Sequence, residues 1–293
     1  MQTPTQQTSK PPAPDAPQDR RRFLATLGAV TLGAVTLGAA GFGAPRAARI
    51  GLQLYTVRDA LGRDFDRTLA RVAEIGYQEV EFAGYFGRGP AQVRAALART
   101  GLAAPSAHVP LGSESEWAAT LDMAREMGHQ YVVLAWLPPE QRRTLDDYRR
   151  LAERLNRAGE AATAAGLRFA YHNHDFELTP LGGSVPYDLL LAGTDASHVA
   201  FEMDVYWVVK AGGDPLAYLA RHPGRFAMLH AKDATAAPER RMADVGSGTI
   251  DFRTILARGA QSGVRHVFVE HDQPAEPLAS ARASFAYLAA LHF

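Results

Sequence analysis

The sequence of 293 residues contains no cysteine and only three lysines, so arginine supplies nearly all of its basic side chains. Without cysteine the chain can form no disulfide, no thiolate metal ligand and no cysteine nucleophile. No G-x-G-x-x-G motif follows the first apolar run, which argues against an open dinucleotide-binding sheet. Because lysine is so scarce, Lys232 in the segment LHAKD is a candidate for a specific role.

The formal net charge of zero hides a difference between two parts of the chain. Residues 1–48 carry five basic and two acidic side chains, which leaves residues 49–293 with a net charge of −3. Proteins that hold a phosphate backbone present a basic surface, and this mildly acidic body does not indicate one. Nucleic acid is therefore not an expected partner.

Residues 1–48 are expected to be a leader that is separate from the fold. Met1–Gln18 is rich in Pro, Gln and Thr and has no apolar period, which is typical of a disordered segment. Arg20, Arg21 and the next residues Arg-Phe-Leu resemble the twin-arginine export signal, and a weakly apolar, Gly-containing stretch follows. We expect a cleaved signal and a periplasmic or secreted protein that meets the membrane only transiently. The alternative is a retained anchor, because Phe23–Phe42 is about long enough to span a bilayer.

Residues 49–293 alternate between strand-like and helix-like patterns. The expected strands are Ile50–Val57, Tyr77–Ala83, Ala104–Val109, Tyr131–Trp136, Phe169–His174, Val199–Asp204, Phe226–His230 and His266–Glu270. Helices follow them, such as Phe65–Ile75 before Gly76 and Pro90–Thr100 before Gly101. Eight such units indicate a single (β/α)8 TIM barrel, in which functional residues lie at the carboxyl ends of the strands.

Each of the last four expected strands ends on, or close to, a His, Asp or Glu. Side chains alternate along a strand, so His172, His230 and Glu270 share a face with the apolar residues two positions earlier, and Asp204 shares a face with Glu202. The inward-facing residues are His172, Asp204, His230 and Glu270. They are 32, 26 and 40 positions apart, as expected for one residue from each βα unit. Convergent imidazoles and carboxylates predict a divalent-metal site, with either His172 or His174 as the ligand from the fifth strand.

Several segments together resemble a known family. They are IGLQLYTVR, SAHVP, FAYHNHDFEL, EMDVYWVVKAGGDP, LHAKD, VGSGTIDF and FVEHD. In this order they resemble the sugar phosphate isomerase/epimerase group of the xylose isomerase-like TIM barrel superfamily, which also contains endonuclease IV, tagatose 3-epimerase and inosose dehydratase. The resemblance covers residues 50–293. It implies an isomerase, an epimerase or a related lyase that acts on a sugar, a keto-sugar or a cyclitol and uses Mn²⁺, Co²⁺ or Zn²⁺.

The resemblance also implies ligands, with one departure from the family pattern. The family's epimerases hold one ion with Glu, Asp, His and Glu, and the last three fall on Asp204, His230 and Glu270. The first Glu falls on His172, so one of the two carboxylate bases is missing. Proton abstraction by one base, or elimination, is therefore favoured over a symmetric two-base epimerisation. Trp207 stands where these epimerases often have a substrate-binding His, and it is expected either to stack on a sugar or to pack in the core.

Further roles are assigned to polar residues at the strand ends. The expected catalytic residues are Glu270, His174 and Lys232, and Glu202 is an alternative base. The expected substrate contacts are Glu81, His108, Asn173, Glu202, Trp207 and Lys232, because a hydroxyl-rich ligand needs several donors and acceptors. Lys232 could instead form a salt bridge with Asp233 or Asp204.

Two other classes of protein remain as alternatives. The first is a barrel that binds a sugar without catalysis, which would explain the substitution at His172. The second is a metal-dependent nuclease related to endonuclease IV, against which the acidic body and the export signal argue. The sequence also leaves open whether copies of the chain form a homo-oligomer.

The twin-arginine interpretation predicts a change of location. Replacing Arg20 and Arg21 by Lys should leave the protein in the cytoplasm, because the export machinery reads the arginine pair itself. Fractionation of the producing cells, with the chain detected by immunoblot, measures this. An unchanged periplasmic or extracellular location of the double variant would contradict the interpretation.

Overall fold

The computed structural model describes residues 49–292. The leader and its export signal lie outside the described residues, so the expectation for residues 1–48 stays a prediction. Among the helices that are described, none is long and apolar enough to cross a membrane.

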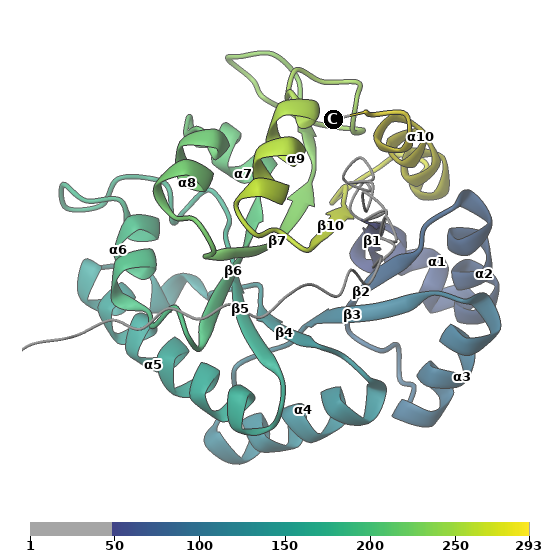
Figure 1. Cartoon of the computed structure of the whole chain (residues 1–293), viewed down its shortest axis with the longest axis horizontal. Coiled ribbons are helices and arrows are strands. Elements are labelled where there is room, and N and C mark those ends of the chain that lie inside the picture. The colour runs from purple at the N-terminus through teal and green to yellow at the C-terminus, as the bar shows by residue number, and fades with distance from the viewer. Residues whose placement is uncertain (1–48, 293) are drawn as a thin grey trace, which may run out of the picture. The chain divides into compact units, whose positions relative to one another are not determined.

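Eight parallel strands close into a barrel in the order β1-β10-β7-β6-β5-β4-β3-β2 (Figure 1). They are β1 (Ile50–Gln53), β2 (Glu79–Ala83), β3 (Ala103–His108), β4 (Tyr131–Leu134), β5 (Arg168–His172), β6 (Val199–Asp204), β7 (Phe226–Ala231) and β10 (His266–Val269). The barrel closes because β1 pairs with both β2 and β10. The expected TIM barrel is confirmed.

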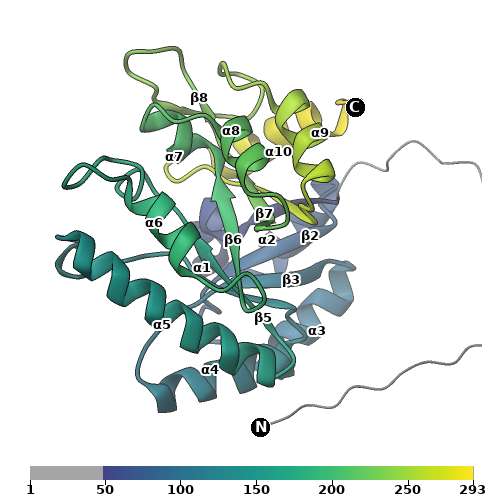
Figure 2. The same ribbon diagram turned by 60° about the vertical axis from the view of Figure 1, so that its left-hand side comes forward.

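Helices surround the barrel and connect successive strands (Figure 2). They are α1 (Arg58–Arg63), α2 (Phe65–Ile75), α3 (Pro90–Thr100), α4 (Glu114–Met127), α5 (Leu145–Ala164), α6 (Pro186–Gly193), α7 (Val205–Lys210), α8 (Pro215–Arg221), α9 (Phe252–Gln261) and α10 (Pro277–Ala289). Local chemistry sets the ends of many of them. Ser113 and Glu116 form a capping box at the start of α4, and Gly128 ends that helix in a left-handed conformation.

The first strand is shorter than expected. Leu54–Val57 forms a 3-10 turn, η1, because the side chain of Gln53 accepts a hydrogen bond from the backbone N–H of Tyr55 at 3.0 Å. A second short turn, η2 (Pro139–Gln141), lies between β4 and α5. The early end of β1 puts Gln53 inside the barrel and Tyr55 at its rim.

A small hairpin after β7 was not expected from the sequence. It consists of β8 (Asp233–Ala234) and β9 (Met242–Ala243). The carboxylate of Asp233 accepts hydrogen bonds from the backbone N–H groups of Ala234, Gly246, Gly248 and Ile250. This buried carboxylate therefore holds the long β7–α9 connection in shape and positions Lys232 just before it.

The barrel interior is apolar in its middle layer and polar toward the carboxyl ends of the strands. The apolar layer is a separate buried cluster of Tyr131, Val133, Ala170, Ala227, Met228 and Phe268. Two positions later along their strands come His172, His230 and Glu270, as the alternation predicts. In the strand register His172 lies opposite Glu202, and Asp204 lies opposite His230. The fold thus brings the polar strand ends together at one mouth of the barrel.

Candidate active site at the carboxyl ends of the strands

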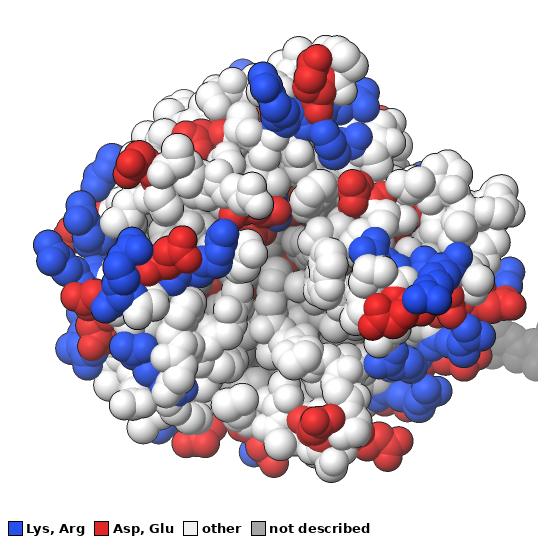
Figure 3. All heavy atoms as spheres, turned by 180° about the vertical axis from the view of Figure 1, so that it is seen from behind, with Lys and Arg blue, Asp and Glu red and all other residues white. Residues whose placement is uncertain are grey.

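A cavity of about 520 Å³ opens at the carboxyl ends of the strands. Figure 3 shows the face opposite to that of Figure 1, which is hollowed near its centre and carries most of its charged side chains toward the periphery. The cavity is lined by Tyr55, Ala83, His108, Ala135, Trp136, Arg142, His172, His174, Asp175, Phe176, Trp207, Lys232, Glu270 and Asp272.

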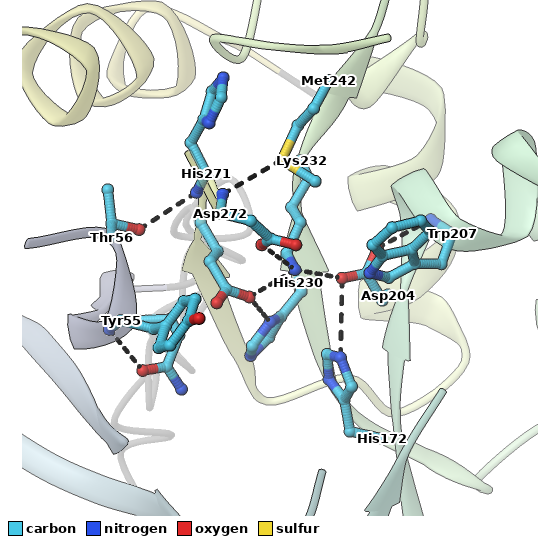
Figure 4. A network of polar contacts seen from close by, with 12 residues as sticks. Tyr55, Thr56, His172, Asp204, Trp207, His230, Lys232, Met242, His271 and Asp272 are labelled. Atoms are coloured by element: carbon cyan, nitrogen blue, oxygen red, sulfur yellow. Dashed lines mark hydrogen bonds and ion pairs between the residues drawn. The ribbon is translucent and has the colours of Figure 1, made fainter. Parts of the chain in front are cut away.

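The ammonium group of Lys232 lies at the deep end of this cavity, among three carboxylates. Its Nζ atom is 3.0 Å from Asp204 Oδ2, 2.7 Å from Glu270 Oε2 and 2.8 Å from Asp272 Oδ1. Figure 4 shows the amine between Asp204 and Asp272. Only 2% of the Lys232 side chain is exposed, so these interactions are shielded from water.

His230 joins this cluster to a second group of histidines. Its Nδ1 atom is 2.8 Å from Glu270 Oε2, and its Nε2 atom is 3.2 Å from Glu202 Oε2. Glu202 Oε2 is also 2.8 Å from His108 Nε2 and 3.0 Å from His172 Nδ1. One carboxylate oxygen thus lies within contact distance of three imidazoles.

The charges of the Lys232 cluster follow from burial and pairing. Burial lowers the pKa of Lys232, but the charges of Asp204 and Glu270 outweigh this and raise it well above its ordinary value. Burial acts to raise the pKa of Glu270, yet Lys232 and His230 hold it well below its usual range. For Asp204 burial dominates and raises the pKa to about 6. At neutral pH Lys232 is therefore an ammonium and Glu270 a carboxylate.

Burial and neighbouring carboxylates act in opposite directions on the pKa values of the histidines, and the balance differs from one histidine to the next. Burial lowers the pKa of His108, but the carboxylates of Glu81 and Glu202 raise it to about 9. Burial wins at His172, whose pKa lies well below its ordinary value although its Nδ1 contacts Glu202. His172 is therefore a neutral imidazole, the form in which histidine binds a metal.

The described residues offer two groups of atoms that fit a metal ion. Asp204, His230 and Glu270 place ligand atoms within 4.8 Å of one another, and so do His108, His172, Glu202 and His230. His172 Nε2 also lies 3.7 Å from Asp204 Oδ2, which puts all four expected ligands around one region. Asp204 Oδ2 is buried and accepts no well-aligned hydrogen bond from a described residue. Nitrogen and oxygen donors of this kind suit Mn²⁺, Co²⁺ or Zn²⁺.

The position of the Lys232 ammonium affects whether a metal ion can bind at these residues. The ammonium contacts both Asp204 and Glu270, two of the residues that would ligate the ion. A divalent cation and the ammonium would therefore compete for the same carboxylates. The residues present therefore fit a divalent ion once the ammonium is displaced from Asp204 and Glu270.

Two further predicted residues lie at the cavity wall. His174 packs parallel to Phe176 at a centroid distance of 5.4 Å, and burial lowers its pKa to about 3. Trp207 lies 5.5 Å from the His174 ring, and its ring is 5.9 Å from Lys232 Nζ. Trp207 Nε1 is buried and has no hydrogen-bond partner among the described residues.

Three residues that were expected to contact substrate lie elsewhere. Glu81 and Glu202 are fully buried behind the cavity wall. Glu81 accepts hydrogen bonds from Gln53 at 2.7 Å and Ser106 at 2.5 Å, and contacts His230 at 2.7 Å. Both carboxylates therefore hold imidazole rings in position and do not line the cavity.

Asn173 is also fully buried, and it joins β5 to β6. Its Oδ1 accepts from the backbone N–H of Asp204 at 3.0 Å, and its Nδ2 donates to the carbonyl of the same residue at 3.4 Å. The Asn173 amide thus fixes the position of the Asp204 backbone at the strand end. It is not among the residues that line the cavity.

Sequence reasoning did not identify Arg142, Asp175 and Phe176 as parts of the site. The guanidinium of Arg142 lies 3.4 Å from the centre of the Phe176 ring, at the cavity wall. Arg142 lies in the polar segment between η2 and α5, and the composition of this segment is typical of a solvent-exposed loop. No signal in the chain pattern marks it as a wall residue.

Residues 69–291 match the family described as xylose isomerase-like TIM barrel. The chain belongs to this family. An inosose dehydratase of Geobacillus kaustophilus is 26% identical over 220 residues, which cover 66% of this chain and 69% of that protein. A crystal structure of a sugar phosphate isomerase/epimerase from Parabacteroides distasonis has 28% sequence identity and a TM-score of 0.74, and covers 83% of this chain and 98% of that chain.

The IolI protein with a bound zinc atom shares the fold, with 14% identity, a TM-score of 0.66 and coverage of 82% of this chain and 97% of that chain. The names of the similar proteins describe sugar isomerases and epimerases as well as dehydratases. The expectation of an enzyme of the isomerase/epimerase or inosose dehydratase kind is confirmed.

A buried carboxyl group supports the loop that carries His174. Glu177 is fully buried, its Oε1 accepts from the hydroxyl of Tyr171 at 2.5 Å, and its Oε2 accepts from the backbone N–H of His174 at 2.8 Å. Burial raises the pKa of Glu177 to about 7 despite these hydrogen bonds. The carboxyl is therefore protonated in the folded chain at a pH where it is ionised in the unfolded chain.

Stability should consequently fall as the pH rises through this interval. Between about pH 4.5 and pH 7 the folded state binds the proton more tightly, so its contribution is present at low pH and lost above pH 7. Relative to Glu177→Gln, the wild type should lose about 2–3 kcal/mol of unfolding free energy between about pH 5 and pH 8. Urea denaturation at both pH values measures this. Glu140→Gln, at an exposed position, is the control, and equal pH dependence of both variants would contradict the assignment.

Proposed function

We propose that this chain is a divalent-metal-dependent enzyme that removes a proton next to the carbonyl of a keto-sugar or cyclitol ketone and then expels the β-hydroxyl as water. The observation that carries the proposal is the arrangement of Glu270 and Lys232. A carboxylate and an ammonium lie 2.7 Å apart at the deep end of one cavity. Such a pair offers a proton acceptor and a proton donor to the same substrate.

Glu270 is the proposed base. It reaches the cavity wall, and Lys232 and His230 keep it ionised. The proton leaves the carbon next to the carbonyl for a Glu270 oxygen, and the carbon–oxygen bond of the β-hydroxyl breaks as Lys232 donates a proton to the departing oxygen. The family's epimerases have a second glutamate where this chain has His172, so the site holds one metal-linked carboxylate base. This difference supports proton transfer on one face over inversion at carbon.

The metal would be held by Asp204, His230 and Glu270 together with His172. When bound, a divalent ion polarises the substrate carbonyl and stabilises the negative charge that develops on its oxygen. The neutral state of His172 and the carboxylates of Asp204 and Glu270 suit this role. The zinc atom bound by the IolI protein supports a metal here, and the identity of the ion stays open among Mn²⁺, Co²⁺ and Zn²⁺.

An unphosphorylated substrate fits the proposed site and the proposed location. The charged side chains on the wall include Arg142 and Lys232 as well as Asp175, Glu270 and Asp272, so basic groups do not predominate as they would for a phosphate. We also propose export by the twin-arginine route, and a substrate met outside the cytoplasm. The name of the Geobacillus kaustophilus relative, inosose dehydratase, supports a cyclitol ketone.

Isomerisation is the second candidate. It begins with the same proton abstraction, after which the proton returns to the neighbouring carbon and no water is lost. The relative from Parabacteroides distasonis, described as a sugar phosphate isomerase/epimerase, favours it. Product analysis separates the candidates, because only dehydration lowers the product mass by that of water.

The proposed metal site predicts opposite effects for two substitutions. Asp204→Ala should abolish stoichiometric binding of Mn²⁺, because it removes both charge and a ligand. Lys232→Met should strengthen binding by about tenfold or more, because it removes the cation that competes for Asp204 and Glu270. Calorimetric titration of metal-stripped protein measures both affinities. Full metal binding by Asp204→Ala, or weaker binding by Lys232→Met, would refute this description of the site.

The proposed base is tested by proton exchange in D₂O. Glu270→Gln should lower metal-dependent incorporation of deuterium into an inosose or keto-sugar by about 10²–10⁴-fold, the usual contribution of a general base. Glu140→Gln, which neutralises an exposed carboxylate outside the cavity, should leave the rate unchanged. NMR and mass spectrometry of the product record both exchange and loss of water. An exchange rate unaffected by Glu270→Gln would rule out Glu270 as the base.

A further inference from the structure

A second cavity of about 420 Å³ adjoins the proposed reaction cavity. The two share five wall residues, which are Tyr55, Ala83, His108, Ala135 and Trp136. The second cavity, called here the side chamber, is bounded by residues that follow β3 and β4, including Pro110, Leu111, Leu137 and Pro138. A ligand in the reaction cavity is therefore adjacent to the side chamber.

The side chamber differs from the reaction cavity in its chemistry. Eight acidic, basic or histidine side chains line the reaction cavity, whereas in the side chamber the polar side chains beyond the shared wall are Gln141 and Arg154. These two are engaged with each other, since Arg154 Nη1 donates to Gln141 Oε1 at 3.0 Å. The hydroxyls of a second sugar ring would find few side-chain partners there, and unpaired polar groups are costly to bury. The chamber suits an apolar group.

Trp136 lines both cavities. It is 53% exposed, which is unusual for the largest apolar side chain and leaves much of the indole free to contact a ligand. The rings of His174 and Phe176 meet it nearly at right angles, at centroid distances of 5.1 and 5.6 Å. Arg142 lies 5.2 Å from the indole centre. These contacts fix the indole before any ligand arrives.

We propose that the substrate carries an apolar, ring-sized substituent on the sugar or cyclitol, such as the aryl aglycone of a glycoside, and that this substituent lies in the side chamber against Trp136. The proposal rests on the proposed function for the placement of the reacting ring. It narrows the substrate class from free sugars to ring compounds with an aromatic or similarly apolar aglycone. The contact area with the indole then supplies the selectivity for the aglycone.

Binding of unreactive glycosides tests this independently of catalysis. Phenyl β-D-glucopyranoside should bind the wild-type protein about tenfold more tightly than methyl β-D-glucopyranoside, as expected for one aromatic contact with partial burial of the ring. Trp136→Ala should remove most of this ratio, and Trp136→Phe should keep part of it. Met123→Ala is the matched control, because Met123 is a large exposed apolar residue outside both cavities. Ligand-observed NMR titration measures the affinities.

Four outcomes overturn the proposal. Equal affinities of the two glycosides, no detectable binding of the phenyl glycoside, or a ratio that survives Trp136→Ala would show that the side chamber does not hold an aglycone. Cellobiose binding as tightly as the phenyl glycoside would show that a second sugar fits as well as an apolar group. If the aryl preference depends on Trp136 but no deuterium exchange occurs with any ketone, the side chamber stands and the proposed chemistry falls. If deuterium exchange occurs but the aryl preference is absent, the proposed chemistry stands and the side-chamber proposal falls.

Discussion

The ammonium of Lys232 holds together the carboxyl end of the barrel. Three carboxylates, from Asp204, Glu270 and Asp272, converge on one point inside a protein, where like charges repel strongly and water is scarce. One buried ammonium contacts all three carboxylates and, together with His230 beside Glu270, makes this arrangement stable. The same cation keeps Glu270 ionised, whereas at Asp204 burial outweighs its effect and raises the pKa to about 6. The proposed catalytic roles and the stability of the cluster therefore depend on the same ammonium group.

Beneath this cluster the protein has a second set of buried charges whose role is support. Glu202 contacts three imidazoles, and Glu81 is fixed by Gln53 and Ser106. Such buried carboxylates are stable only when every partner is in place, so they hold the histidine rings in fixed orientations. The polar residues at this end of the barrel are consequently held rigidly. Loops such as the one that carries Trp136 form the remaining surface of the site.

The sequence allowed the barrel and the core of the site to be predicted for a simple reason. Alternation along short buried strands puts every second side chain inside, so residues such as Asp204, His230 and Glu270 had to converge once the chain closed into a barrel. The end of β1 was not predictable in the same way. Leu54–Val57 has the composition of a strand, but the Gln53 side chain competes for the backbone and turns it into a 3-10 helix.

The sequence by itself thus determined the fold class, the strand-end residues that meet, and the scarcity of lysine that singled out Lys232. Only the tertiary structure decided which of these residues face the cavity and which lie behind it. Glu81 and Glu202 have the same inward strand-end pattern as Glu270, yet depth in the barrel makes these two residues supports and leaves Glu270 at the wall. The side chamber likewise depends on two loops far from each other in sequence, and contacts of that kind leave no periodic trace in the chain.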